Sequence, residues 1–103
     1  MPGQSQTQLS DAMTDAMRPE KIGHRLMLLR KAHNLRPSEI SDMLGMERTY
    51  WSRFETGKRA ITEKTAALLV ERFGVTLDFL ILGRWDRLPL DLAEKMRAID
   101  AEE

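Results

Sequence analysis

Four side chains that can hydrogen-bond recur at helical spacing near the middle of the chain: Arg48, Thr49, Ser52 and Arg53. Residues three and four apart lie on one face of a helix, so these side chains are expected to point the same way. An Arg side chain can bond O6 and N7 of guanine together, and a Thr side chain can contact a base edge or the thymine methyl group. The spacing therefore predicts a helix whose outer face suits the edges of base pairs.

Two cations, Lys58 and Arg59, follow this stretch directly. Cationic head groups suit backbone phosphates, which fix the register of a protein on DNA without reading its sequence. Charge runs in loops are often only solvated surface. The position next to a base-reading helix favours phosphate contact here.

The elements that must hold this face are two short helices joined by a tight turn over residues 37–56. Gly45 supplies the positive φ that such a turn needs, and Ser41 is small enough for a close approach of the two helices. Apolar side chains must point inward from both helices and from the turn: Ile40, Leu44, Met46, Trp51 and Phe54. The pattern predicts a helix-turn-helix whose second helix spans Arg48–Glu55.

Start and stop signals predict three further helices around this pair. Proline or threonine opens each, and asparagine or glycine ends it: Pro19 to Asn34, Thr62 to Gly74, and Thr76 to Gly83. No alternation of apolar and polar residues predicts a strand. We therefore expect an all-α fold, a compact five-helix bundle.

The two ends of the chain differ from this bundle. Residues 1–17 are rich in Gln, Ser and Thr. Leu9, Met13 and Met17 are spaced for one face of a short helix after Ser10, but we favour a flexible N-terminal arm. The DNA-binding domain is expected over residues 18–83 and a helical tail over residues 84–103.

The tail, where Pro89 suits the start of a sixth helix, carries a narrow apolar seam formed by Leu88, Leu92, Met96 and Ile99. Such a seam either folds back on the bundle or pairs with a second copy. We expect a homodimer, through this tail or through the fifth helix, because one reading helix discriminates an operator poorly.

The distribution of charge also points to DNA, although the formal net charge is zero. Residues 21–59 carry nine Lys and Arg against four Asp and Glu, a balance of +5. Residues 1–20 balance to −2 and residues 78–103 to −3. Salt screens charges beyond a Debye length of about 8 Å, so a phosphate senses only the local field. The basic middle segment, and not the net charge, therefore determines the attraction for DNA.

Three stretches, in order and at the right separations, resemble the lambda-repressor-like helix-turn-helix family, also called the xenobiotic-response-element family. They are Ile22–Arg30 (IGHRLMLLR), Ser52–Arg59 (SRFETGKR) and Phe73–Leu80 (FGVTLDFL). The resemblance covers about residues 22–83 and implies a five-helix bundle that binds a palindromic double-stranded DNA operator as a homodimer. It also implies that the four residues of the outer face meet bases and that Tyr50 lies on the backbone side.

The chain departs from the family pattern at Arg36-Pro37, at Glu47 and at Trp51, which is larger than the usual Ile or Val. Arg36-Pro37 stands where the family often has Ser-Gln, so the Gln contact to phosphate is lost; Arg36, with Ser38 after it, is expected to bind phosphate instead. Glu47 stands where the family often has a Ser cap, which brings a negative charge near DNA.

The sequence offers little support for metal binding or catalysis. The absence of cysteine excludes thiolate metal sites and favours an intracellular compartment. His24 and His33, nine residues apart, fall on opposite faces of a helix, so we expect structural histidines and no metal. No nucleophile–base order and no Gly-rich phosphate cradle appears, so we expect no catalytic residue, no enzyme and no cofactor.

These observations predict a bacterial or phage transcriptional regulator, a repressor, that acts in the cytoplasm on the nucleoid. No signal peptide, membrane span or effector domain is expected. The alternative is a protein-interaction module, such as an antitoxin whose acidic C-terminal tail binds a partner protein.

Overall fold

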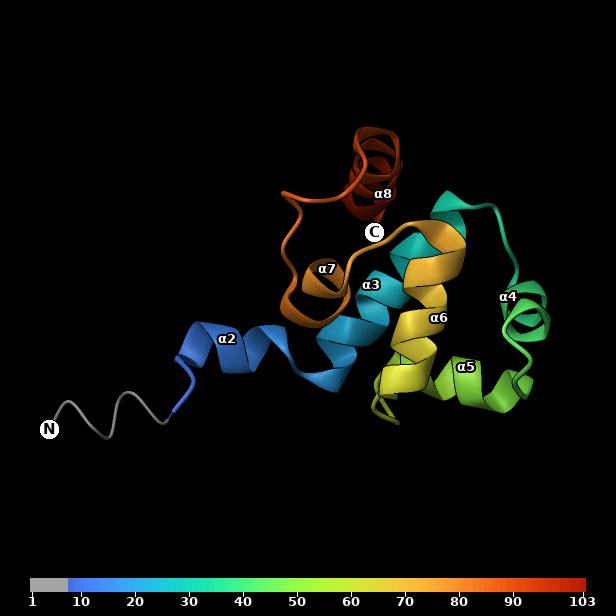
Figure 1. Ribbon diagram of the computed structural model, residues 1–103, viewed down its shortest axis with the longest axis horizontal. Helices are drawn as coiled ribbons and strands as arrows, with labels where there is room; N and C mark the ends of the chain where they lie inside the picture. Colours follow the sequence, from blue (N-terminus) through green and yellow to red (C-terminus); the bar gives the residue numbers. More distant parts are fainter. Residues whose placement is uncertain (1–7) are drawn as a thin grey trace, which may run out of the picture.

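The structure is a computed structural model that describes residues 8–103, and these form seven helices and no strand (Figure 1). In chain order the helices are α2 (Asp11–Ala16), α3 (Pro19–Ala32), α4 (Pro37–Met43), α5 (Arg48–Thr56), α6 (Glu63–Phe73), α7 (Leu77–Leu82) and α8 (Leu90–Glu102). The expected all-α fold is confirmed. In this part of the chain no helix combines the length and the apolar character that crossing a membrane requires.

Side-chain caps explain where the later helices begin. The hydroxyl of Thr62 accepts a hydrogen bond from the Thr65 N–H at 3.2 Å, and that of Thr76 accepts one from the Phe79 N–H at 3.0 Å. Each cap satisfies an amide that the helix cannot pair internally. Both helix starts were expected from the sequence.

Helix α3 runs through the middle of the molecule and contacts α5, α7 and α8 (Figure 1). Its apolar side chains meet residues from every later helix in one core. The large side chains with less than 2% exposure include Leu26, Leu29, Ile40, Trp51, Leu69, Phe79 and Met96. One core therefore holds α4 and α5 in place against the rest of the bundle.

The C-terminal helix α8 packs on α3, so the apolar seam of the tail folds back on the bundle. Leu88, Leu92 and Met96 are buried there. At the rim, His24 Nε2 lies 2.8 Å from Asp100 Oδ1, a carboxylate partner that the sequence did not predict. Of the two alternatives for this seam, the structure adopts the first, and the seam is not free for a second copy.

The flexible arm expected over residues 1–17 needs correction. Residues 11–16 form α2, because the Ser10 hydroxyl accepts a hydrogen bond from the Met13 N–H at 3.1 Å and caps the helix. Asp15 lies 3.2 Å from Lys21, which ties the end of α2 to the start of α3. Residues 1–7, the remainder of that arm, lie outside the described residues.

Candidate nucleic-acid interface

Helix α5 presents to solvent the face that its sequence predicted. Its exposed side chains include all four proposed base readers: Arg48, Thr49, Ser52 and Arg53. Trp51 and Phe54, on the opposite face, are 0% and 4% exposed. One side of α5 is therefore anchored in the core, while the other carries hydrogen-bonding groups with open space in front of them.

The turn between α4 and α5 has the geometry that its residues require. Gly45 adopts a φ of 67°, which a side chain disfavours. The Met46 N–H donates to the Ser41 carbonyl at 3.0 Å, and the Gly45 N–H donates to the Asp42 carbonyl at 3.2 Å. Ser41 is fully buried and donates its hydroxyl to the Pro37 carbonyl at 2.7 Å, so a polar residue sits at the helix contact without an unpaired group.

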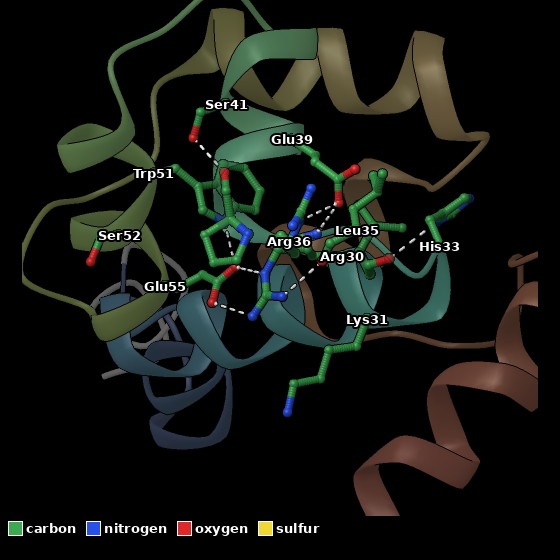
Figure 2. A network of polar contacts seen from close by, with 12 residues as sticks. Arg30, Lys31, His33, Leu35, Arg36, Glu39, Ser41, Trp51, Ser52 and Glu55 are labelled. Carbon is green, nitrogen blue, oxygen red and sulfur yellow. Dashed lines mark hydrogen bonds and ion pairs between the residues drawn. The ribbon is translucent and has the colours of Figure 1, made fainter.

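A polar network joins the inner side of α5 to α3 (Figure 2). Arg30 donates from Nε to Glu55 Oε2 at 2.6 Å and from Nη2 to Glu55 Oε1 at 3.1 Å. Its Nη1 donates to the Leu35 carbonyl at 2.9 Å, and the indole N–H of Trp51 donates to Glu55 Oε2. One carboxylate therefore accepts from residues on two helices.

This network is nearly dry. The Arg30 and Glu55 side chains are 12% and 13% exposed. The pair is bidentate, a geometry that fixes the relative orientation of the two groups and strengthens the ion pair. Sequence reasoning assigned no role to Arg30 or Glu55 and treated Trp51 as apolar core alone. The two charged residues stand in the family-like motifs, but only the fold brings them together.

Helices α3 and α5 also cross in backbone contact at Gly23. A Cβ atom added there would lie 2.5 Å from the Phe54 carbonyl oxygen and would contact the Glu55 carbonyl as well. Only hydrogen fits between the two helices at this point. The sequence placed the close approach at Ser41, and this second one was not foreseen.

Three of the proposed phosphate-binding residues are exposed: Tyr50 in the first turn of α5, and Lys58 and Arg59 shortly after its last residue. The backbone N–H groups of Lys58 and Arg59 both donate to the Arg53 carbonyl, at 3.0 and 3.2 Å. The Arg59 guanidinium lies 4.6 Å from the centre of the Tyr50 ring, a cation–π distance. The Arg59 side chain therefore reaches back from the loop after α5 to Tyr50 in the first turn of that helix.

The other two proposed phosphate-binding residues, Arg36 and Ser38, lie at the start of α4. Glu39 Oε1 accepts the Arg36 backbone N–H at 2.8 Å and lies 3.3 Å from Arg36 Nε (Figure 2). The backbone hydrogen bond, aided by the Arg36 side chain, lowers the pKa of Glu39 below its usual value. Glu39 thus stays charged beside Arg36 and offsets part of its attraction for phosphate.

Glu47 occupies the position before α5, where its side chain makes no capping hydrogen bond. This agrees with the expectation that Glu is a poor cap there. Arg48, the first residue of α5, forms an ion pair with Asp42 on α4 and not with Glu47. Its Nη2 lies 3.6 Å from Asp42 Oδ2.

Comparison with known proteins adds one finding. A family model described as helix-turn-helix, HTH_3, matches residues 26–80, more than half of the 103-residue chain. The match runs from the middle of α3 to α7 and includes both helices of the motif. Neither the curated proteins nor the solved structures gave a match.

Proposed function

The chain belongs to the lambda-repressor-like helix-turn-helix family of DNA-binding regulatory domains, and from this premise we propose that it represses transcription by binding a specific operator. The observation that carries the proposal is the outer face of α5. Four hydrogen-bonding side chains there are exposed, while the inner face is held by the core and by a nearly dry ion pair.

We assign base reading to α5 on grounds of size and chemistry. A helix with side chains is about 10–12 Å across and fits a major groove about 12 Å wide. In that groove, Arg48 and Arg53 suit guanine, and Thr49 and Ser52 suit several base edges.

We assign phosphate contact to the residues that flank this face. Tyr50 lies in the first turn of α5, Lys58 and Arg59 follow its C-terminal end, and Arg36 and Ser38 stand at the start of α4. Phosphate contacts on both sides of a reading helix fix its register in the groove.

We further propose a homodimer on a palindromic operator. The α8 seam is used within the bundle, which leaves the fifth helix of the family fold, α7, as the dimer element. Leu77 on α7 is 52% exposed, and with Ile61 and Ile81 it lines an apolar groove of about 550 Å³ between α6 and α7. A second copy seated there would bury this surface and place two reading helices on one operator.

The alternative function, a protein-interaction module with an acidic tail, is less favoured. Asp100 and Glu103 of the tail pair with His24 and Lys31 of α3, at 2.8 and 3.0 Å. Part of the negative charge is thus used within the chain. We place the protein with DNA, on the nucleoid of a bacterium or on a phage genome.

Alanine variants of Arg53 and Lys58 test this assignment. Arg53→Ala is expected to weaken operator binding by about 1–3 kcal/mol and to relax the preference at one base pair, because a base contact is lost. Lys58→Ala is expected to weaken binding to all sequences alike and to reduce the salt slope by about 1, because a phosphate contact is lost.

The measurement is the binding constant on operator and on single-base-pair variants, over a series of salt concentrations. If the two alanine variants change affinity and base preference in the same way, the division into base readers and phosphate contacts is wrong.

A further inference from the structure

A carboxylate stands next to one of the proposed base readers. Asp42 Oδ2 on α4 lies 3.6 Å from Arg48 Nη2 on α5, across the turn. The two side chains are 67% and 69% exposed. A carboxylate on a surface that approaches phosphates weakens DNA binding in general. We therefore expect Asp42 to have a function that offsets this loss of affinity.

The backbone that carries this pair is well fixed. The Asp42 carbonyl accepts the Gly45 N–H at 3.2 Å, and Ser41 before it is buried and bonded to both α4 and the turn. Arg48 begins α5, whose next turn is anchored by the buried Trp51. Asp42 is thus held in reach of Arg48 by the turn geometry, without help from a flexible loop.

The contact leaves the Arg48 side chain able to read a base. A guanidinium has five N–H donors in a planar fork, and the Asp42 contact engages the Nη2 end alone. Nη2 carries two N–H groups, so one can face Asp42 while the other joins Nη1 in the fork that bonds the two acceptors of guanine. A long, exposed Arg side chain otherwise samples many rotamers, and holding one end reduces that freedom.

We propose that Asp42 is a specificity-determining residue that positions Arg48 for guanine and lowers affinity for all other DNA. The inference rests on the proposed function of α5. In water the exposed pair is weak, since solvent screens it. Against DNA the water is displaced and the attraction grows, so the pair tightens only in the complex. At a site without a guanine for Arg48, the Asp42 carboxylate still repels the DNA phosphates but gains no base contact in return. Binding to such sites is therefore weakened.

Glu39 provides a matched comparison on the same helix. It is also a carboxylate beside an arginine, with Oε1 3.3 Å from Arg36 Nε. However, Glu39 sits in the first turn of α4, and its side chain pairs with the backbone N–H and the guanidinium of Arg36, not with a proposed base reader. Neutralising Glu39 removes the same charge without touching the support of Arg48.

The experiment first selects an operator for the parent from a random library of DNA duplexes. It then compares the parent with Asp42→Asn, Glu39→Gln and Arg48→Ala on that operator and on all its single-base-pair variants. Asp42→Asn is expected to bind non-specific DNA more tightly than the parent. It is also expected to lose about five-fold or more of the preference at one base pair, the lower range of a single base contact. That base pair is the one at which Arg48→Ala loses its preference.

Glu39→Gln is expected to raise affinity for all sequences and to leave every base preference unchanged. The inference is overturned if Asp42→Asn keeps all the parent's preferences, or if it resembles Glu39→Gln. A parent protein that binds no duplex DNA with salt dependence would instead contradict the proposed function, so the two failures are distinguishable. None of the three substituted side chains is buried, so each variant is expected to fold. Circular dichroism checks that each variant keeps its helices.

Discussion

Replacing Glu55 with alanine is expected to lower the free energy of unfolding by about 3–5 kcal/mol, the cost of breaking a buried ion pair by removing one partner. The substitution leaves the Arg30 guanidinium nearly buried, at 12% exposure, without its carboxylate. It also leaves the indole N–H of the fully buried Trp51 without an acceptor. The loss is a large share of the roughly 5–15 kcal/mol that stabilises a small domain.

Glu55→Gln is the companion variant, because it keeps the shape and one acceptor but removes the charge. We expect it to cost less than Glu55→Ala and to remain folded even if the alanine variant does not. Urea denaturation gives the free energies, and pairing each variant with Arg30→Met in a double-mutant cycle gives the coupling between the two residues. A loss below about 1 kcal/mol for Glu55→Ala, as for a surface pair, would contradict the structural role given to the network.

Gly23→Ala is expected to destabilise the protein and to displace the reading helix. The new methyl group would lie 2.5 Å from the Phe54 carbonyl oxygen, whereas real Cβ atoms essentially never approach another heavy atom closer than 3.0 Å. Both obstructing groups are backbone of α5, so no side chain can move aside. Relative to glycine, alanine stabilises a helix by about 1 kcal/mol, whereas overpacking of this kind costs about 1–3 kcal/mol or more. The net effect of the substitution is therefore expected to be destabilising.

The control for this variant is Gly74→Ala at the end of α6. Gly74 has a φ of 69°, and a Cβ added there meets nothing within 4 Å, so the change strains the backbone without a clash. Both variants are expected to lower the melting temperature. Only Gly23→Ala is expected to weaken operator binding in conditions where both are folded, because only it shifts α5. Equal operator affinity for the two variants would contradict the importance of the α3–α5 crossing.

The helix-turn-helix itself could be predicted from the sequence, because its signals are local. Apolar residues at helical spacing, Gly45 at the turn and the threonine caps each act within a few residues. The outer face of α5 followed from the same periodicity, since Trp51 and Phe54 had to face inward.

The support of that face could not be predicted, because it depends on contacts between distant residues. Arg30 and Glu55 are 25 residues apart, and only the crossing of α3 and α5 makes them a bidentate pair. Gly23 meets Phe54 for the same reason. The Asp42–Arg48 contact depends on the angle at the turn, which residue types do not fix.

The two ends of the chain show the limit of composition as a guide. Residues 11–16 (DAMTDA) were expected to belong to an arm, yet a Ser10 cap begins a helix there and the Asp15–Lys21 ion pair ties that helix to α3. The tail seam allowed two alternatives, folding back on the bundle or pairing with a second copy. The apolar surface offered by α3 decided between them, and that surface appears only once the bundle has formed.

The most direct test of the central claim is selection of bound duplexes from a random DNA library by the intact protein. We predict an enriched sequence with two inverted half-sites, their centres about 10–10.5 base pairs apart or a multiple of it, and guanines at the positions that Arg48 and Arg53 reach. A single, unrepeated half-site would contradict the dimer but not the reading of bases by α5. A pool that stays random through repeated rounds would contradict the assignment of α5 as a sequence-reading helix.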